Sequence, residues 1–243
     1  MASNTKTVAF FGASTGVGLS ALKHSLAAGL QCTALCRTPS KLETIFPAGS
    51  TPNLKIIKGD AHDIATVTEC IRTEDGSIVD MIITTIGSRP VWYKMTLEDP
   101  ECCRKGATVL LDAITQLRTQ GATGHPHIVA FSTTGMSEFG RDYPLAMFPI
   151  YMWLLKAAHE DKKIMEDRFI ASGESFTVLR GSILTDGETK KTVRVGIEDP
   201  KTGRESTAIG YTISREDSGR WITENLIVKK TKEYENKILM ITT

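Results

Sequence analysis

Three glycines mark the clearest chemical signal in this sequence, the segment Gly12-Ala-Ser-Thr-Gly16-Val-Gly18. The segment follows an apolar run, Thr7–Phe11, and precedes apolar residues at helical spacing. A glycine turn between a strand and a helix lets backbone amides approach an anion, and the helix N-terminus adds free N–H donors. In this context the pattern predicts a dinucleotide site, the alternative being a turn that binds nothing. The expected diphosphate contacts are Gly12, Ser14, Thr15, Gly16, Val17 and Gly18.

The end of the next predicted strand, Gln31–Cys36, indicates which dinucleotide is preferred. An NAD-selective site places Asp or Glu there to bind the ribose 2′-hydroxyl, whereas this chain has Arg37, with Lys41 nearby. A guanidinium binds a 2′-phosphate through two parallel hydrogen bonds, and a carboxylate would repel it. We therefore expect NADP(H), with the alternative that Arg37 is an ordinary solvated strand end.

Two further strand ends are predicted to complete the cofactor site. Gly59-Asp60-Ala61 follows the predicted strand Leu54–Ile57, and Asp63 is expected to cap the next helix. Gly87 follows the predicted strand Val79–Ile86 and would admit the cofactor's ribose. The residues assigned to this part of the site are Asp60, Ala61, Thr85, Ile86, Gly87 and Arg89.

The elements that must position these residues alternate between apolar strand runs and helical patterns. Further strands are predicted at His127–Ser132 and Ser175–Arg180, and further helices at Ile64–Ile71, at Asp99–Gln120 and within 146–172. Strands that are apolar on both faces indicate an α/β fold with a parallel sheet covered on both sides. Right-handed crossovers favour a doubly wound sheet. We expect a single domain over residues 1–243, with a small substrate-side extension from about residue 182.

The predicted pattern changes after Gly181. Residues Thr185–Gly203 are typical of loops or an edge hairpin, and they are followed by a predicted helix, Arg215–Ile227, and a strand, Ile238–Ile241.

Composition excludes several classes of function. The chain has 29 Lys and Arg against 28 Asp and Glu, a net charge of +1 that provides no field for gripping nucleic acid or an anionic membrane. No apolar run reaches the ~18 residues of a membrane span, and the N-terminus lacks a signal peptide, so we expect a cytoplasmic protein. The five cysteines lack paired C-x-x-C spacing, which argues against a disulfide framework or a metal site. The expected partner is a small molecule, and a homodimer is left open.

Several of these segments together resemble one protein family. The resemblance rests on the Gly12–Gly18 turn, Arg37, Gly87-Ser88-Arg89, Ser132-Thr133-Thr134, residues 172–181 and residues 211–217. The chain resembles the atypical short-chain dehydrogenase/reductases, in particular the NmrA-like proteins and the flavin/biliverdin-IX-beta reductase-like enzymes. This resemblance implies a Rossmann-type fold with NADP(H) along the carboxyl edge of the sheet.

The resemblance also indicates where catalytic groups would lie. In the larger family, a Ser or Thr after the fifth strand acts with a Tyr-x-x-x-Lys pair on the next helix. Ser132, Thr133 and Thr134 supply hydroxyls at the matching strand end. Alignment from Ser172-Gly173 places Lys162 at the family lysine, but Ala158 stands where the tyrosine is expected.

The proton donor therefore stays open at the sequence level. Tyr151 and Lys156 are five residues apart, which separates them by ~140° around a regular helix. Candidates for the donor are Tyr151, His159 and water, and Lys162 either holds the ribose or pairs with Glu166 on the surface.

An almost wholly apolar segment, Leu145–Leu155, precedes the predicted helix. It is either a buried helix start, a dimer face, or the wall of a pocket for a bulky apolar substrate. The wall would include Met147, Phe148, Tyr151, Met152 and Trp153, with Trp92 and Tyr93 opposite.

Together these observations predict an NADPH-dependent reductase of a bulky, apolar or conjugated small molecule. Two alternatives share the fold: a non-catalytic NADP(H)-sensing regulator, and a non-redox isomerase or cyclase.

Overall fold

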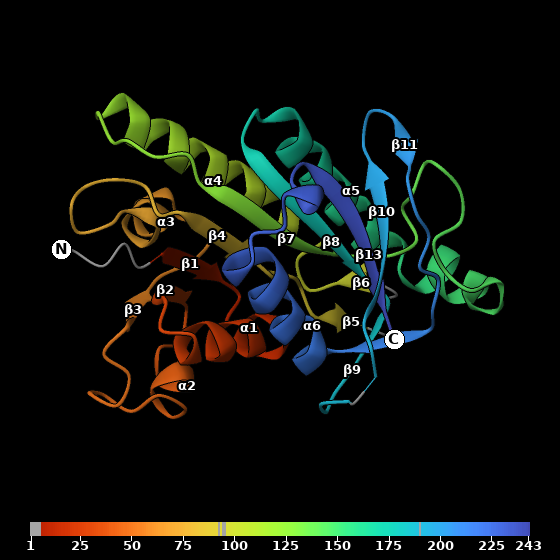
Figure 1. The fold of residues 1–243 in the computed structure, drawn as a ribbon, viewed down its shortest axis with the longest axis horizontal. Helices are drawn as coiled ribbons and strands as arrows, with labels where there is room; N and C mark the ends of the chain where they lie inside the picture. Colours follow the sequence, from red (N-terminus) through yellow and green to blue (C-terminus); the bar gives the residue numbers. More distant parts are fainter. Residues whose placement is uncertain (1–5, 92, 94–95, 190) are drawn as a thin grey trace.

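A nine-stranded sheet forms the centre of the protein, and most of its strands are the apolar runs of the sequence (Figure 1). The computed structural model describes residues 6–91, 93, 96–189 and 191–243. The strand order is β11-β10-β13-β8-β7-β4-β1-β2-β3. Seven strands run parallel: β1 (Thr7–Phe11), β2 (Gln31–Cys36), β3 (Leu54–Lys58), β4 (Met81–Thr84), β7 (His127–Thr133), β8 (Ser175–Gly181) and β13 (Lys237–Thr242). Because the chain moves outward from β1 in both directions, the predicted doubly wound α/β fold is confirmed.

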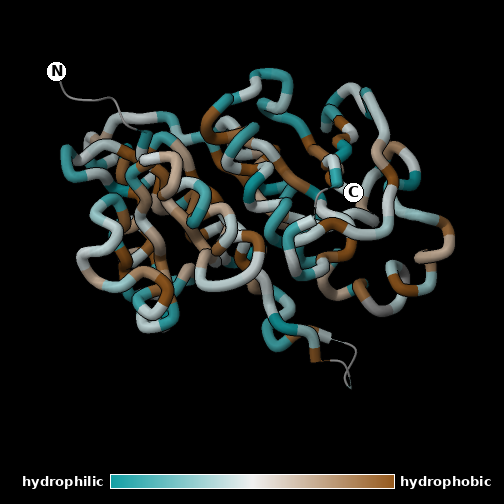
Figure 2. The backbone as a smooth tube through the Cα atoms, turned by 60° about the horizontal axis from the view of Figure 1, so that its bottom comes forward, coloured by the Kyte–Doolittle hydropathy of each residue, from teal (hydrophilic) through white to brown (hydrophobic). Residues whose placement is uncertain are grey.

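Helices cover both faces of this sheet. They are α1 (Gly16–Ala27), α2 (Ser40–Glu43), α3 (Ile64–Ile71), α4 (Cys102–Thr119), α5 (Lys156–Ala171) and α6 (Arg215–Trp221), the last continuing as a π-helix over Ile222–Val228. Asp63 caps α3 as predicted, since its carboxylate accepts a hydrogen bond from the Ala65 amide. Along the backbone, hydrophobic stretches alternate with hydrophilic ones (Figure 2).

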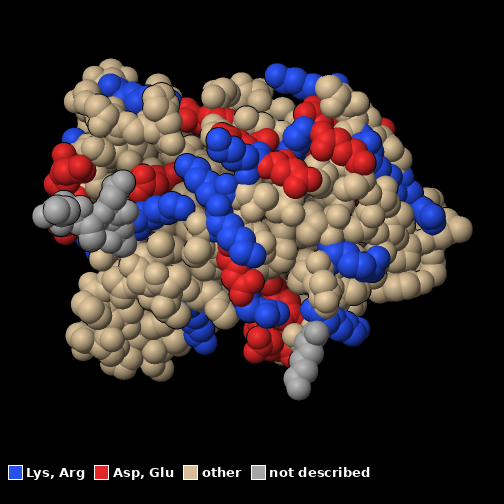
Figure 3. All heavy atoms as spheres, in the orientation of Figure 1, with Lys and Arg blue, Asp and Glu red and all other residues tan. Residues whose placement is uncertain are grey.

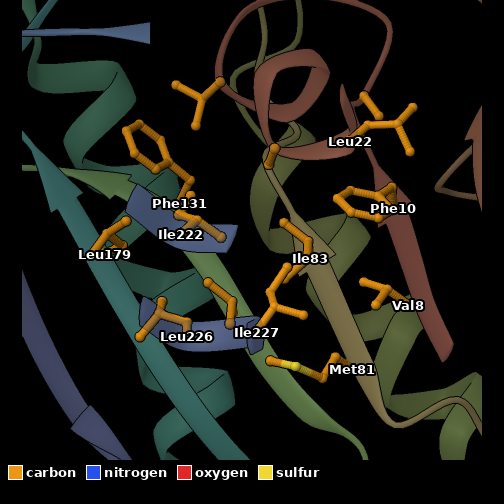
Figure 4. Packing of buried hydrophobic residues seen from close by; sticks show 14 of the residues in the cluster. Val8, Phe10, Leu22, Met81, Ile83, Phe131, Leu179, Ile222, Leu226 and Ile227 are labelled. Carbon is orange, nitrogen blue, oxygen red and sulfur yellow. The ribbon is translucent and has the colours of Figure 1, made fainter. Parts of the chain in front are cut away.

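Two hydrophobic cores lie on opposite faces of the sheet, because side chains alternate along each strand. Val8 and Phe10 of β1 pack with Leu22 of α1 and with Ile222 of the π-helix on one face (Figure 4). Ala9, Phe11 and their neighbours pack beneath α3, α4 and α5 on the other.

Helices α1 and α6 lie side by side and run in the same direction. Ser20 Oγ donates to the carbonyl of Glu216 at 2.8 Å, and further along Thr223 Oγ1 donates to the carbonyl of Ala21 at 3.1 Å. A Cβ on Gly219 would lie 2.4 Å from Ser20 Cβ, so a glycine is required at this contact. Both helices therefore begin at the carboxyl edge of the sheet.

Short strands at that edge were not predicted. β5 (Pro90–Val91) pairs with β6 (Thr96–Leu97), and β9 (Ile183–Thr185) pairs in parallel with β12 (Thr212–Ser214). Strands of two or three residues are too short to show a periodic pattern. The expected edge hairpin is present as β10 (Arg194–Asp199) and β11 (Gly203–Arg204), with β10 antiparallel to β13.

The described residues contain no helix long and apolar enough to cross a membrane. On the face shown in Figure 3, Lys and Arg side chains lie close to Asp and Glu side chains, which agrees with the near-zero net charge.

Candidate cofactor cleft and catalytic edge

A cleft of about 720 Å³ opens at the carboxyl edge, where β1, β2, β3 and β4 end. Most residues expected to bind the cofactor line it. They are Gly12, Ser14, Thr15, Arg37, Lys41, Asp60, Ala61, Thr85, Ile86, Gly87 and Arg89. The remaining three, Gly16, Val17 and Gly18, form the start of α1 directly behind this lining.

The glycine turn is packed so tightly at Gly12 and Gly18 that neither position has space for a Cβ. Gly12 has φ +84°, and a Cβ there would lie 2.9 Å from the Thr85 carbonyl oxygen. A Cβ on Gly18 would lie 2.3 Å from Thr85 Oγ1, which itself donates to the Gly12 carbonyl at 3.2 Å. The start of α1 fits a dinucleotide diphosphate, because its glycines place no side chain of their own between an anion and the backbone amides.

Arg37 and Lys41 lie exposed at the cleft, beyond the end of β2. Neither forms an ion pair within the part of the chain that the structure describes. A guanidinium without a carboxylate partner remains available to a phosphate.

The cleft also contains residues that the sequence analysis missed. The His62 amide donates to Asp60 Oδ1 at 3.0 Å, and His62 Nε2 donates to the Cys102 carbonyl at 2.9 Å. The Asp99 amide donates to Ser88 Oγ at 2.7 Å. Burial, with help from Asp99, raises the pKa of the Cys102 thiol. A signal for Asp99 and Cys102 existed, because both fall at the start of the predicted helix Asp99–Gln120, although α4 itself begins at Cys102.

At the end of β7, Ser132 and Lys162 lie at adjoining positions. Ser132 is buried, and its Oγ has no hydrogen-bond partner among the described residues. Lys162 Nζ, from α5, donates to the Phe131 carbonyl at 2.9 Å. The alternative pairing of Lys162 with Glu166 is wrong, because Glu166 faces the interior and binds Arg180 at 2.6 Å.

Thr134 and Tyr151 form a separate buried cluster with His159. Thr134 Oγ1 and the Tyr151 hydroxyl are 2.8 Å apart, and the Tyr151 ring stacks on Tyr143 at 4.4 Å and on His159 at 5.7 Å between centroids. A Cβ on Gly135 would lie 2.3 Å from Tyr151 Cδ1, so the loop backbone also presses on the ring. Thr133, between the two groups, is half-buried.

Burial keeps the two aromatic proton-donor candidates neutral. It raises the pKa of Tyr151, against the effect of the Thr134 hydrogen bond. It lowers the pKa of His159 to about 4, against a hydrogen bond to the Thr134 backbone. A phenol with a raised pKa is a weak acid, and an imidazole that is neutral at pH 7 has no extra proton to give.

A fully buried arginine, Arg180, lies next to this cluster. Its guanidinium binds Glu166 at 2.6 Å and Glu198 at 3.3 Å, and lies 4.0 Å from Asp142. Asp142 in turn accepts the Gly135 amide at 2.9 Å. Burial raises the pKa of Asp142, and Arg180 opposes that rise. These contacts join β8, α5, β10 and the loop after β7, and the sequence analysis did not identify them.

The apolar segment divides between inside and outside. Tyr151 is 2% exposed, whereas Leu145, Phe148 and Trp153 are 69%, 47% and 73% exposed. The interpretation as a buried helix start is therefore wrong for the exposed three. Met147 is half-buried and Tyr93 is exposed, whereas Trp92 and the Met152 side chain lie outside the described residues.

Known proteins similar to this chain include an NAD(P)H-binding family and two proteins of Aspergillus species. The sequence matches the NAD(P)H-binding family over residues 12–227. It is 37% identical over 268 aligned positions to a protein of Aspergillus terreus named "Reductase pytE", with all of both chains covered. It is 28% identical to "Oxidase pynE" of Aspergillus niger, over 91% of this chain and 93% of that protein.

Solved structures share the fold at low identity. A short-chain dehydrogenase/reductase of Veillonella parvula in complex with NADP is 11% identical, with a TM-score of 0.72 over 98% of this chain and 94% of that one. The anaerobillin reductase ChuY of Escherichia coli O157:H7 is 17% identical, with a TM-score of 0.68 over 98% and 96%. These likenesses agree with the Rossmann-type fold expected from the sequence.

Proposed function

The chain belongs to the NAD(P)H-binding family, and on that premise we propose that it is an NADPH-dependent reductase of a bulky, apolar or conjugated small molecule. The observation that supports this most directly is the cleft, which brings the glycine turn and Arg37 to one edge of the sheet. The full-length relative at 37% identity is named a reductase, which supports the same class of reaction.

The cofactor supplies the hydride when bound, so the protein must orient the cofactor and the acceptor. Arg37 and Lys41 would hold the 2′-phosphate, and the amides at the start of α1 would hold the diphosphate. Lys162 would hold the ribose beside Ser132, since its Nζ reaches from α5 to the carbonyl of Phe131, the residue before Ser132.

Ser132 would orient the oxygen of the acceptor, and water would supply the proton. The Ser132 hydroxyl is unpartnered among the described residues, whereas the Tyr151 hydroxyl is engaged with Thr134. The raised pKa of Tyr151 and the lowered pKa of His159 both argue against these side chains as the acid. Thr134, Tyr151 and His159 would then stabilise the loop that follows β7.

Two variants test these assignments. Ser132→Ala should lower kcat at least tenfold with the same NADPH affinity, because one oriented hydroxyl is lost from the reaction site. Tyr151→Phe keeps the ring stack and should leave kcat within about threefold, with a pH profile unchanged. A large loss in Tyr151→Phe and none in Ser132→Ala would reverse the assignment.

The exposed apolar side chains would form the substrate wall. Leu145, Phe148 and Trp153 present large apolar surfaces, which suit a conjugated ring system. The competing role is a homodimer face. Sedimentation and steady-state kinetics of the wild type and of Trp153→Ser separate the two roles. A substrate wall predicts that Trp153→Ser raises KM without changing the sedimenting mass, whereas a dimer face predicts a lower mass.

The whole chain would work as one unit in the cytoplasm, with residues from about 182 on the substrate side. Oxidation of NADPH, followed at the nicotinamide absorption band with quinones, flavins and enones, tests the reductase directly. The second candidate is the sensing regulator, because Ala158 stands at the position where the catalytic tyrosine is expected. Tight NADPH binding without turnover of any acceptor would favour this regulator. Turnover without net NADPH consumption would favour an isomerase or cyclase.

A further inference from the structure

Arg215, at the first position of α6, lies against the glycine turn from the far end of the sequence. The nearest atoms to a Cβ built on Gly16 are Arg215 Cδ at 3.4 Å and Arg215 Nε at 3.8 Å. Gly16 is the residue at which α1 begins, and its φ of +59° is a backbone conformation that favours glycine. The Arg215 side chain therefore covers the position at which the diphosphate approaches the backbone.

The parallel packing of α1 and α6 fixes this placement. Ser20 Oγ binds the Glu216 carbonyl at 2.8 Å, and Gly219 lies against Ser20 without space for a Cβ. Ser214 caps α6 by accepting the Asp217 amide at 2.9 Å, so the chain direction at Arg215 is also set. The capped start of α6 and its contact with α1 therefore hold the backbone of Arg215 beside the glycine turn.

The ion pair that Arg215 forms in this structure is weak. Its Nη1 lies 2.7 Å from Asp186 Oδ1, but the Asp186 side chain is 84% exposed. Ion pairs in water contribute little, because solvent screens the attraction and the side chains lose freedom. A diphosphate bridge carries more charge than one carboxylate and accepts two parallel hydrogen bonds from a guanidinium. The exchange of Asp186 for a diphosphate is therefore favourable.

We propose that Arg215 is a second anchor for the dinucleotide diphosphate, held by Asp186 in the free protein and released to the cofactor on binding. Asp186 directly follows β9, and the next residues bind α6 through Thr189, whose Oγ1 donates to Asp217 at 2.6 Å. Release of Asp186 therefore couples cofactor binding to the segment after β9, on the substrate side of the cleft. This inference rests on the cofactor site and not on the identity of the acceptor.

Binding of NADPH and NADH, measured by calorimetry without substrate, tests the proposal. Because both dinucleotides contain the diphosphate, Arg215→Ala should weaken both by the same factor, roughly ten- to a hundredfold. Arg37→Ala should weaken NADPH alone. Arg215→Lys, which keeps the charge without the fork, should recover part of the loss. Asp186→Asn should tighten both dinucleotides by up to about fivefold.

Arg72→Ala is the matched control, since Arg72 is an exposed arginine beyond the end of α3 and away from the cleft. It should bind both dinucleotides as the wild type does, and thermal unfolding of the free variants should confirm that Arg215→Ala is folded. Hydrogen exchange of residues 183–189 should change on NADPH addition in the wild type and not in Arg215→Ala.

Equal affinities of wild type and Arg215→Ala for both dinucleotides would overturn the proposal. A loss confined to NADPH would also overturn it, because that result would assign Arg215 to the 2′-phosphate. Since no acceptor is present in these measurements, neither result bears on whether the protein is a reductase.

Discussion

The two ends of the active-site edge are built in different ways. At the cofactor end, the start of α1 is bare backbone, and Arg37 lies exposed without an ion-pair partner in the described chain. At the end of β7, Thr134, Tyr151 and Arg180 are buried and bound to neighbours from distant segments. The first region is prepared for an anion from solution, and the second already has its polar partners within the protein. Changes to the exposed cations of the first region should alter binding, and changes to the buried, hydrogen-bonded side chains of the second should alter stability.

The largest effect is expected at Arg180. Arg180→Met would leave Glu166 buried without a cation and Glu198 with Arg204 alone, 3.9 Å away. Loss of one partner from a buried ion pair typically costs about 3–5 kcal/mol of unfolding free energy. Urea unfolding measures this loss. Lys163→Met, which removes partly exposed pairs with Asp167 and Glu138, is the control and should cost less than about 1 kcal/mol. If Arg180→Met were as stable as the wild type, the buried end would not depend on its ion pairs for stability, and the difference between the two ends would be refuted.

At the cofactor end, Arg37→Asp should change binding and leave the fold intact. If Arg37 binds the 2′-phosphate as proposed, replacing this cation with an anion should weaken NADPH binding by about 2–3 kcal/mol, because attraction becomes repulsion. Calorimetry with NADPH and NADH checks this, with NADH affinity serving as the internal control. The same NADPH affinity in both proteins would remove Arg37 from the site.

Gly18 and Gly87 belong to the same proposed cofactor site but differ in how closely other atoms pack against them. Gly18→Ala should destabilise the protein by about 1–3 kcal/mol, since the new Cβ would lie 2.3 Å from Thr85 Oγ1. Gly87→Ala should leave the melting temperature nearly unchanged, because no atom lies within 4 Å of its Cβ position. Thermal unfolding of both variants decides whether the turn is as closely packed as the structure indicates.

The most gradual expected effect is a pH dependence from the buried end. The pKa of His159 is lowered from 6.5 to about 4 by burial, so between these values the unfolded chain binds a proton that the native protein does not. Stability should fall on acidification through this window by about 1.4 kcal/mol per pH unit. His127, which burial also lowers to about 4, adds an equal slope.

His159→Gln isolates one part of this slope. Asp142 opposes it, because burial raises the pKa of that carboxyl and favours proton uptake by the native protein. The difference between wild type and His159→Gln cancels the contributions of Asp142 and His127. Parallel stability curves for the two proteins between pH 6.5 and 4 would show that His159 is not held neutral by the fold.

The gathering of the proposed cofactor-binding residues at one cleft was largely predictable from sequence, because their signals are local. Gly12, Gly16 and Gly18 lie within seven residues, and the strand ends that carry Arg37 and Gly87 follow apolar runs directly. In a parallel sheet those ends must meet at one edge, so spacing along the chain is enough to place them.

The buried end was not predictable for the opposite reason. Arg180 pairs with Glu166 and Glu198, and Asp142 belongs to a loop with no periodic pattern. Their proximity depends on the register of β8 and β10 in the sheet, which a single sequence does not encode as a local signal. The π-helix around Tyr151 broke the regular spacing on which the comparison with Lys156 was based.

The pairing of α1 with α6 also has a consequence for how the protein is made. Contacts such as Ser20 with Glu216 join residues separated by 196 positions. At a synthesis rate of about 5–20 residues per second, α1 is synthesised roughly ten to forty seconds before α6, the helix that packs against it. During that interval the nascent chain exposes apolar surface such as Leu22, and we expect chaperones to bind there before the nucleotide cleft exists.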